Sequence, residues 1–213
     1  MQLQRIEFKL YLITDRQLFS TTAEFVKSVG EALDAGVKAV QLREKDLPTR
    51  ELLDMSYKFR ELTARFGAKL FINDRLDIAL SVDADGIHLG QSGIPVREIR
   101  RVAGNGLMIG CSAHSVKEAM EAEKDGADFI TFGPLFPTPS KLKYGGPVGL
   151  DSLRKVKNKV GLPIFGIGGI KSENIEDVIN SGASGVALIS GILSARDKAS
   201  AAREYLKKVG ERQ

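Results

Sequence analysis

The architecture of this chain is indicated by one stretch, Asp125-Gly126-Ala127-Asp128-Phe129-Ile130-Thr131-Phe132. It has the form of a helix end, a tight turn at the glycine and a short apolar strand. Related stretches occur at residues 34–40, 83–87 and 181–186. Parallel strands that are buried on both faces are written as continuous apolar runs, and they require crossover helices between them. The repeat therefore predicts a parallel sheet built from β/α units.

Eight short apolar runs occur along the chain. They are residues 10–14, 39–42, 69–73, 86–89, 108–111, 129–132, 163–167 and 185–189. Eight units favour a closed (β/α)8 TIM barrel of the α/β class, and we expect one such domain over residues 1–213. The alternative is an open doubly wound sheet, which usually has five or six strands and a Gly-x-Gly-x-x-Gly turn after its first strand. The first run lacks that turn.

Helices are predicted between the runs, because apolar residues recur three and four positions apart, as in Phe25, Val29 and Leu33. Thr21 and Ser115 each precede a glutamate by three residues, which is the spacing of a capping box at a helix start. Four glycines stand where helices are expected to end: Gly36, Gly67, Gly126 and Gly182. A final helix is expected to pack on the barrel exterior through Ala202, Tyr205, Leu206 and Val209.

The composition is that of a globular protein and excludes several classes. Of the 213 residues, 43% are hydrophobic and 27% are charged, which argues against a disordered chain. The 31 basic and 27 acidic residues are scattered, so the net charge of +4 does not indicate a nucleic-acid partner. One cysteine cannot form an internal disulfide, and no apolar stretch approaches the ~18 to 20 residues that span a membrane. We therefore expect a cytoplasmic protein with no membrane partner.

Polar residues collect after the second run, at the end of the barrel where active sites of this fold lie. Alternation places Gln41, Arg43 and Lys45 on one side of the strand, which we expect to face inward. Two cations at such a place are costly unless an anion lies between them. The alternative is a strand end in which Glu44 and Asp46 form salt bridges with these cations.

Further candidates follow the third and fifth runs. Asn73 and Asp74 offer an amide and a carboxylate suited to Mg2+, although the same pair is a common helix cap. Ser112 can donate a hydrogen bond to a phosphate oxygen. His114 is either a site residue or a loop residue, and Cys111 is expected to be a buried hydrophobic residue rather than a nucleophile.

A second group of candidates follows the last three runs. The loop after the sixth run carries the hydroxyls and the ammonium of Thr138, Ser140 and Lys141. Gly168-Gly169 and Ile189-Ser190 follow the seventh and eighth runs, where this fold usually binds phosphate. The alternative is that these glycines serve only to form tight turns. Two anion sites are predicted, as a reaction that joins two phosphorylated small molecules requires.

These motifs, taken in order, resemble those of the thiamine phosphate synthase family. They are Tyr11-Leu-Ile-Thr-Asp15, Gln41-Leu-Arg-Glu-Lys45, Phe71-Ile-Asn-Asp74, Asp85-Gly-Ile-His-Leu-Gly-Gln91, Ser112-Ala-His-Ser115, Gly133-Pro-Leu-Phe-Pro-Thr138, Gly166-Ile-Gly-Gly169 and Ile189-Ser190. The resemblance implies an enzyme that joins a pyrimidine diphosphate to a thiazole monophosphate and releases diphosphate.

The resemblance also implies roles for individual residues. It implies a pyrimidine diphosphate site made by Gln41, Leu42, Arg43, Glu44, Lys45, Asn73, Ser112 and Lys141. Within it, the residues expected to assist catalysis directly are Arg43, Lys45, Ser112 and Lys141. The thiazole phosphate site is implied at Thr138, Pro139, Ser140, Gly169, Ile189 and Ser190. Asp74 is implied as the Mg2+ ligand, and the family allows a homodimer.

The chain departs from the family pattern at Gly93, where the family has a second Mg2+ carboxylate. The stretch from Tyr144 to Gly149 also resembles the sister branch of thiazole tautomerases. Two further hypotheses are therefore kept. The first is a tautomerase in which His114 moves the proton, and the second is a phosphate-ligand sensor that binds without turnover.

Overall fold

The computed structural model describes residues 6–138 and 146–210, and these residues form a closed barrel of eight parallel strands. Each strand pairs with its neighbours in chain order, and β1 closes the ring against β8. The strands are β1 Leu10–Ile13, β2 Ala39–Leu42, β3 Lys69–Asn73, β4 Gly86–Leu89, β5 Met108–Ala113, β6 Phe129–Phe132, β7 Ile164–Ile167 and β8 Gly185–Leu188.

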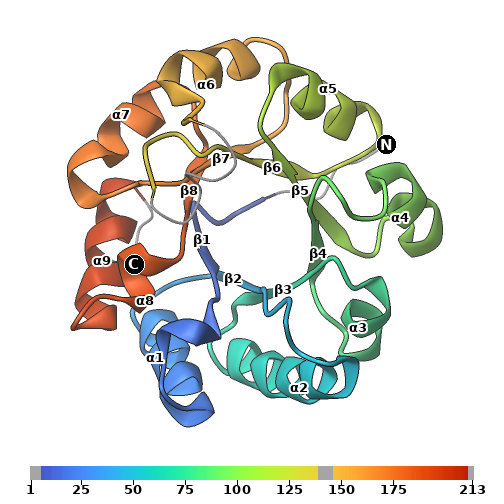
Figure 1. Ribbon diagram of the computed structural model, residues 1–213, viewed down its shortest axis with the longest axis vertical. Helices are drawn as coiled ribbons and strands as arrows, with labels where there is room; N and C mark the ends of the chain where they lie inside the picture. Colours follow the sequence, from blue (N-terminus) through green and yellow to red (C-terminus); the bar gives the residue numbers. More distant parts are fainter. Residues whose placement is uncertain (1–5, 139–145, 211–213) are drawn as a thin grey trace.

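Helices surround the strands as an outer ring (Figure 1). They are α1 Thr22–Asp34, α2 Thr49–Arg65, α3 Leu76–Ser81, α4 Val96–Ala103, α5 Val116–Lys124, α6 Gly149–Lys157, α7 Ile175–Asn180, α8 Ser190–Leu193 and α9 Lys198–Lys208. Two short 3-10 turns, Arg16–Leu18 and Ser172–Asn174, precede α1 and α7. Within the described residues, no helix is long and apolar enough to cross a membrane.

The predicted (β/α)8 barrel is therefore confirmed, and the doubly wound alternative is wrong. The strand limits lie within a residue of the predicted ones, except that β5 continues two residues further, to Ala113. Thr21 and Ser115 cap α1 and α5 as predicted, and each hydroxyl accepts the N–H of the glutamate three residues later. The apolar residues of the final helix are buried, also as predicted.

The core has two layers, one on each side of the strands. The outer layer lies between strands and helices and is mainly aliphatic. The inner layer fills the barrel and is aromatic, with the rings of Phe8, Tyr11, Phe71, Phe129 and Phe165 packed at centroid distances of 5.2 to 6.1 Å. Offset and edge-to-face contacts at such distances are favourable for aromatic rings.

Glycines on neighbouring strands make room for these rings. Phe71, Phe129 and Phe165 are register partners or near neighbours of glycines on β4, β5 and β8. A Cβ at Gly110 would stand 2.6 Å from the His88 ring nitrogen Nδ1 and would also collide with the Phe129 ring. These glycines are therefore required by the packing of the barrel interior.

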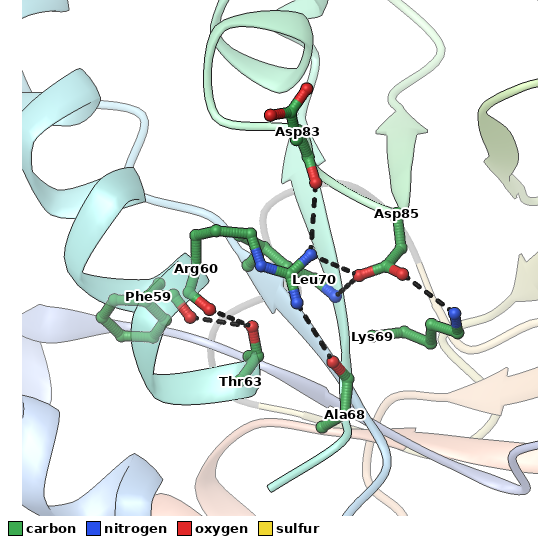
Figure 2. A network of polar contacts seen from close by, with 8 residues as sticks. All are labelled: Phe59, Arg60, Thr63, Ala68, Lys69, Leu70, Asp83 and Asp85. Atoms are coloured by element: carbon green, nitrogen blue, oxygen red, sulfur yellow. Dashed lines mark hydrogen bonds and ion pairs between the residues drawn. The ribbon is translucent and has the colours of Figure 1, made fainter. Parts of the chain in front are cut away.

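A polar network lies at the amino-terminal end of the barrel, between α2, β3 and β4 (Figure 2). The carboxylate of Asp85 accepts hydrogen bonds from Arg60 Nη1 at 2.6 Å, Lys69 Nζ at 2.9 Å and the Leu70 N–H at 2.9 Å. Burial raises the pKa of Asp85, but these three donors outweigh it, and the pKa falls below its usual range. Figure 2 also shows Arg60 donating to the carbonyl oxygen of Asp83.

The same arrangement recurs at the later repeats noted in the sequence. Asp128 precedes β6 and accepts from the Ile109 N–H at 2.7 Å and from Arg100 Nη2 at 2.6 Å. Ser184 precedes β8 and accepts the Ile164 N–H at 3.3 Å. In these three repeats, the turn places a side-chain acceptor directly before β4, β6 or β8. There it accepts a hydrogen bond from a backbone N–H of the preceding strand.

Candidate functional site

Gln41, the one polar residue of β2, faces the barrel interior, as alternation along the strand predicts. Gln41 is buried, and its Nε2 donates to the Tyr11 hydroxyl at 3.1 Å. Burial raises the pKa of Tyr11 well above its usual value, so this hydroxyl stays protonated. Val40 and Leu42 point to the outer layer instead. The side chain of Leu42, which the family resemblance places at the substrate, therefore points away from the barrel interior, and its contact with a substrate stays a prediction.

His88 of β4 lies beside this pair in the barrel interior. Its Nε2 is 3.1 Å from the Ser112 hydroxyl and 3.4 Å from the Thr131 hydroxyl. Its Nδ1 is buried and has no hydrogen-bond partner among residues 6–138 and 146–210. Burial, followed by the positive charges of Arg43 and Lys45, lowers the pKa of His88 to about 3 against the opposing effect of Asp74. The imidazole is therefore neutral near neutral pH.

Asp74 stands at the carboxyl end of β3, above this neutral polar surface. Its Oδ1 accepts the Gly90 N–H at 2.7 Å, and its Oδ2 accepts Asn73 Nδ2 at 2.9 Å and Lys45 Nζ at 3.3 Å. Burial raises the pKa of Asp74, but these donors lower it more, and the net shift is downward. Asp74 also has a positive φ of 56°, an uncommon conformation for a residue other than glycine. The structure thus brings Lys45, Asn73 and an ionised Asp74 together, as predicted.

Gly93 lies directly against this carboxylate. The Gly93 N–H donates to the carbonyl oxygen of Gly90 at 3.0 Å, which folds residues 90–93 into a tight turn. A Cβ at position 93 would stand 2.9 Å from Asp74 Oδ1. A side chain at this position would therefore share the Asp74 site, and glycine leaves the site with one carboxylate. Within the described parts of the chain, no three His, Cys, Asp or Glu side chains gather as a metal site.

Glu44 does not point into the barrel mouth. Its buried carboxylate accepts hydrogen bonds from the Thr14 hydroxyl at 2.5 Å and the Arg16 N–H at 3.1 Å. Burial raises its pKa, against the hydrogen bond from Thr14. Thr14 in turn accepts the Arg43 N–H at 2.9 Å, so Glu44 braces the backbone from which Arg43 projects. The alternative salt-bridged strand end is found only in part, because Glu44 and Asp46 pair with Arg16 rather than with Arg43 or Lys45.

The loops after β6 and β7 pack against each other at the same end of the barrel. The N–H groups of Leu135 and Phe136 donate to the carbonyl oxygens of Ile167 and Gly168, at 2.8 and 3.1 Å. Gly169 has a φ of 66°, and a Cβ there would stand 2.7 Å from the Phe136 side chain. Glycine at this position is therefore explained by packing, and its contact with a phosphate stays a prediction.

The remaining candidates of the second anion site are placed only in part. Ile189 and Ser190 follow β8, the strand that pairs with β7, and Ser190 begins the four-residue helix α8. In the loop after β6, Thr138 is the last residue described before the gap at residues 139–145. Pro139, Ser140 and Lys141 lie outside the described residues, as does Tyr144.

His114 and Cys111 have structural surroundings. Nδ1 of His114 lies 2.6 Å from the Gly133 carbonyl oxygen, and its backbone N–H donates to Glu118 at 2.7 Å. His114 thus joins the end of β5 to the loop after β6. Cys111 is buried in the outer layer, and burial raises the pKa of its thiol to about 11, as expected for a residue that is not a nucleophile.

Three residues of this site were not predicted as site residues: Tyr11, His88 and Thr131. The first two lie inside motifs that carry the family resemblance, yet a short strand buried on both faces does not mark its inward positions by hydrophobicity. Alternation along β4 places His88 on the same side of the strand as Gly90, two residues later. The pairing of β4 with β5 then brings the His88 side chain to Ser112, and these two signals could have identified it.

The chain is similar to proteins of one family over nearly its whole length. A family model described as thiamine monophosphate synthase matches residues 10–192. The thiamine-phosphate synthase of Moorella thermoacetica is 45% identical over 199 residues, which are 92% of this chain and 93% of that protein. The thiamine-phosphate synthase of Pyrococcus furiosus is 42% identical over 207 residues, 97% of each chain.

Solved structures agree with these similarities. The thiamine phosphate pyrophosphorylase structure from Pyrococcus furiosus superposes with a TM-score of 0.86 at 42% identity, over 96% of each chain. The structure of a 3-hexulose-6-phosphate synthase superposes with a TM-score of 0.71 at 20% identity, a likeness that concerns the fold alone.

Proposed function

Since the chain belongs to the thiamine monophosphate synthase family and is a transferase that makes thiamine phosphate, we propose its two substrates and the residues that bind them. The substrates are 4-amino-5-hydroxymethyl-2-methylpyrimidine diphosphate and 4-methyl-5-(2-phosphooxyethyl)thiazole, or the carboxylated form of this thiazole. The observation that carries the proposal is the contact of Lys45 and Asn73 with the ionised Asp74, above an uncharged polar barrel interior.

The two parts of the first substrate match the two parts of this site. The diphosphate would lie at the mouth, where Arg43 can bind two phosphate oxygens and Lys45 supplies a point charge. The pyrimidine ring would lie below it, against Gln41, Ser112 and His88. These groups are neutral, and they can donate and accept hydrogen bonds without opposing a developing positive charge.

The reaction proposed for this site proceeds by loss of diphosphate. The carbon–oxygen bond breaks, and its electron pair leaves with the diphosphate. The electron-rich aminopyrimidine stabilises the resulting methyl cation, and the lone pair of the thiazole nitrogen then forms the new carbon–nitrogen bond. No protein nucleophile is required, which agrees with the protonated thiol of Cys111. The protein contributes charge neutralisation and alignment of the two rings.

The thiazole phosphate is assigned to the second group of loops. Thr138, Gly169 and Ser190 are proposed to bind it, together with Pro139, Ser140 and Ile189. Lys141 is proposed to add its charge to the leaving diphosphate. The positions of Gly169 and Ser190 after adjacent strands β7 and β8 support this assignment, since this fold commonly binds phosphate there.

Mg2+ is proposed as the cofactor, with Asp74 as its protein ligand. Mg2+ is often held by one or two carboxylates together with substrate phosphates, and one ionised carboxylate is the donor set found here. When bound, the ion would neutralise charge on the diphosphate oxygens. Asn73 and the Gly90 N–H fix the position of the Asp74 carboxylate.

The proposal is tested with the purified protein, both substrates and Mg2+, by detecting thiamine phosphate. We expect Asp74→Ala and Lys141→Ala to lower kcat by about 100-fold or more at saturating substrates, because they remove charge stabilisation in the transition state. Asp54→Asn, on the exposed face of α2, is the matched control and should retain wild-type kcat. Near wild-type kcat in both site variants would exclude these assignments.

The same assay separates the two other hypotheses. A tautomerase would convert the thiazole carboxylate phosphate without Mg2+ and would lose that activity in His114→Asn. A sensor would bind the thiazole phosphate by calorimetry and turn over neither substrate. The contact of His114 with the Gly133 carbonyl oxygen favours a structural role for this histidine.

A further inference from the structure

Lys45 forms an ion pair with a protein carboxylate, that of Asp74. Its Nζ lies 3.3 Å from Asp74 Oδ2. The Lys45 side chain is 48% exposed and the Asp74 side chain is 25% exposed. The pair is therefore accessible from the barrel mouth, and Lys45 is free to turn. The Cα of Gly90 lies alongside, and a Cβ there would be 4.0 Å from Lys45 Nζ and 3.6 Å from Asp74 Oδ1.

Three donors contact the Asp74 carboxylate, and one of them carries a positive charge. Its Oδ1 receives the Gly90 N–H, and its Oδ2 receives both Asn73 and Lys45. Among the described acidic residues, Asp74 is the one paired with Lys45, and Gly93 supplies no second carboxylate beside it. A divalent cation at Asp74 would compete with the ammonium group of Lys45, directly at Oδ2 and by charge repulsion at Oδ1, and would gain only one protein carboxylate.

We propose that Lys45 controls how tightly the metal binds: its ammonium group competes with the metal for Asp74, and it leaves Asp74 when it turns to a diphosphate oxygen. The proposal rests on the proposed function, because it requires a diphosphate at this mouth. Metal and diphosphate then bind with positive coupling, so each raises the affinity of the protein for the other. The positive charge of Lys45 thus interacts first with the Asp74 carboxylate and then with the leaving diphosphate.

The proposal makes an unusual prediction for removal of the lysine charge. Lys45→Met should bind Mn2+ more tightly than the wild type does when no diphosphate is present. A charge-assisted hydrogen bond and a competing cation are both removed, and because the pair is partly exposed we expect a gain of about tenfold in Mn2+ affinity. Electron paramagnetic resonance of free and bound Mn2+ measures this gain without any turnover. Lys45→Gln is a second variant and should show the same gain.

Matched variants locate the effect. Lys69→Met removes a lysine that pairs with Asp85 at 2.9 Å at the opposite end of the barrel, and it should leave the Mn2+ affinity unchanged. The double variant Lys45→Met, Asp74→Asn should lose the gain. Equal Mn2+ affinity in the wild type and both Lys45 variants, or a gain that survives Asp74→Asn, would overturn the proposal.

Inorganic diphosphate completes the test. The ratio of Mn2+ affinities with and without saturating diphosphate should be larger for the wild type than for Lys45→Met. Formation of the Mn2+–diphosphate complex in solution is the same for both proteins, so it cancels in this comparison. Calorimetry of metal-free diphosphate with the wild type separates the two levels of the argument. Absence of binding there counts against the proposed function, whereas binding with no difference in the ratio counts against the role of Lys45 alone.

Discussion

His88 shows how one residue links the stability of the barrel to its chemistry. Its pKa is about 3 in the folded protein and 6.5 in its ordinary state, so between these values the unfolded chain binds the extra proton. The free energy of unfolding should therefore fall as the pH decreases from about 6.5, with a slope of up to about 1.4 kcal/mol per pH unit. The measurement is urea denaturation between pH 7 and pH 5 for the wild type and His88→Gln, with the difference between the two proteins taken at each pH.

The variant isolates the contribution of this group, because every other titrating residue is common to both proteins. The wild type should lose stability relative to His88→Gln as the pH falls, since glutamine does not titrate. Parallel curves would mean that His88 is solvated or charged in the folded state. The neutral imidazole would then no longer explain how a cationic intermediate is tolerated beside it.

At the scale of the strand, the inner aromatic layer depends on glycines opposite the rings. Gly110 of β5 is the clearest case, because a Cβ there would be 2.6 Å from His88 Nδ1 and would press on Phe129. Gly110→Ala should lower the free energy of unfolding by about 1 to 3 kcal/mol, as overpacking does in other cores. Gly106→Ala is the control, since its Cβ would meet only the Ala103 carbonyl oxygen at 3.9 Å. Equal denaturation midpoints for both variants would contradict a tightly packed barrel interior.

The strands themselves are predictable because each is a short apolar run, and four of them, β2, β3, β6 and β8, follow a helix-ending glycine. The inward direction of Gln41 also follows from alternation along β2. Which residues form the inner layer does not follow from the sequence pattern, because residues such as His88 and Phe129 lie in strands that are buried on both faces. Hydrophobicity is then uniform along the strand, and only the pairing of neighbouring strands shows which side chains meet.

The polar contacts of the site are the part that sequence patterns predict least. Glu44 belongs to the same motif as Arg43 and Lys45, yet it is directed away from the mouth toward Thr14. Contacts between residues of different units, such as Lys45 with Asp74, depend on the pairing of β2 with β3 and on the conformation of the residues that follow the two strands. The departure at Gly93 is visible in the sequence, whereas its contact with Asp74 is a property of the folded loop.

The two ends of the barrel have different roles: the carboxyl end carries the proposed chemistry, and the amino-terminal end contributes to stability. The proposed substrate contacts follow the strands, whereas the networks of Asp85 and Asp128 precede them. Active sites of this fold lie at the carboxyl end, and residues at the other end serve stability. The amino-terminal networks should therefore affect unfolding and leave turnover unchanged.

Asp128→Ala tests this division most directly. The side chains of Asp128 and Arg100 are only 2% and 11% exposed, and the substitution also removes the acceptor of the buried Ile109 N–H. We expect the free energy of unfolding to fall by about 3 kcal/mol or more, because loss of one partner leaves a buried charge with weaker partners. Asp85→Ala should cost less, since Asp85 and Arg60 are 18% and 23% exposed. Urea denaturation measures both losses, and kcat below the unfolding transition should stay within about twofold of the wild type, a difference of roughly 0.4 kcal/mol in activation free energy. A large loss of kcat in folded Asp128→Ala would show that the amino-terminal end is coupled to the reaction, because this residue is remote from every proposed substrate contact.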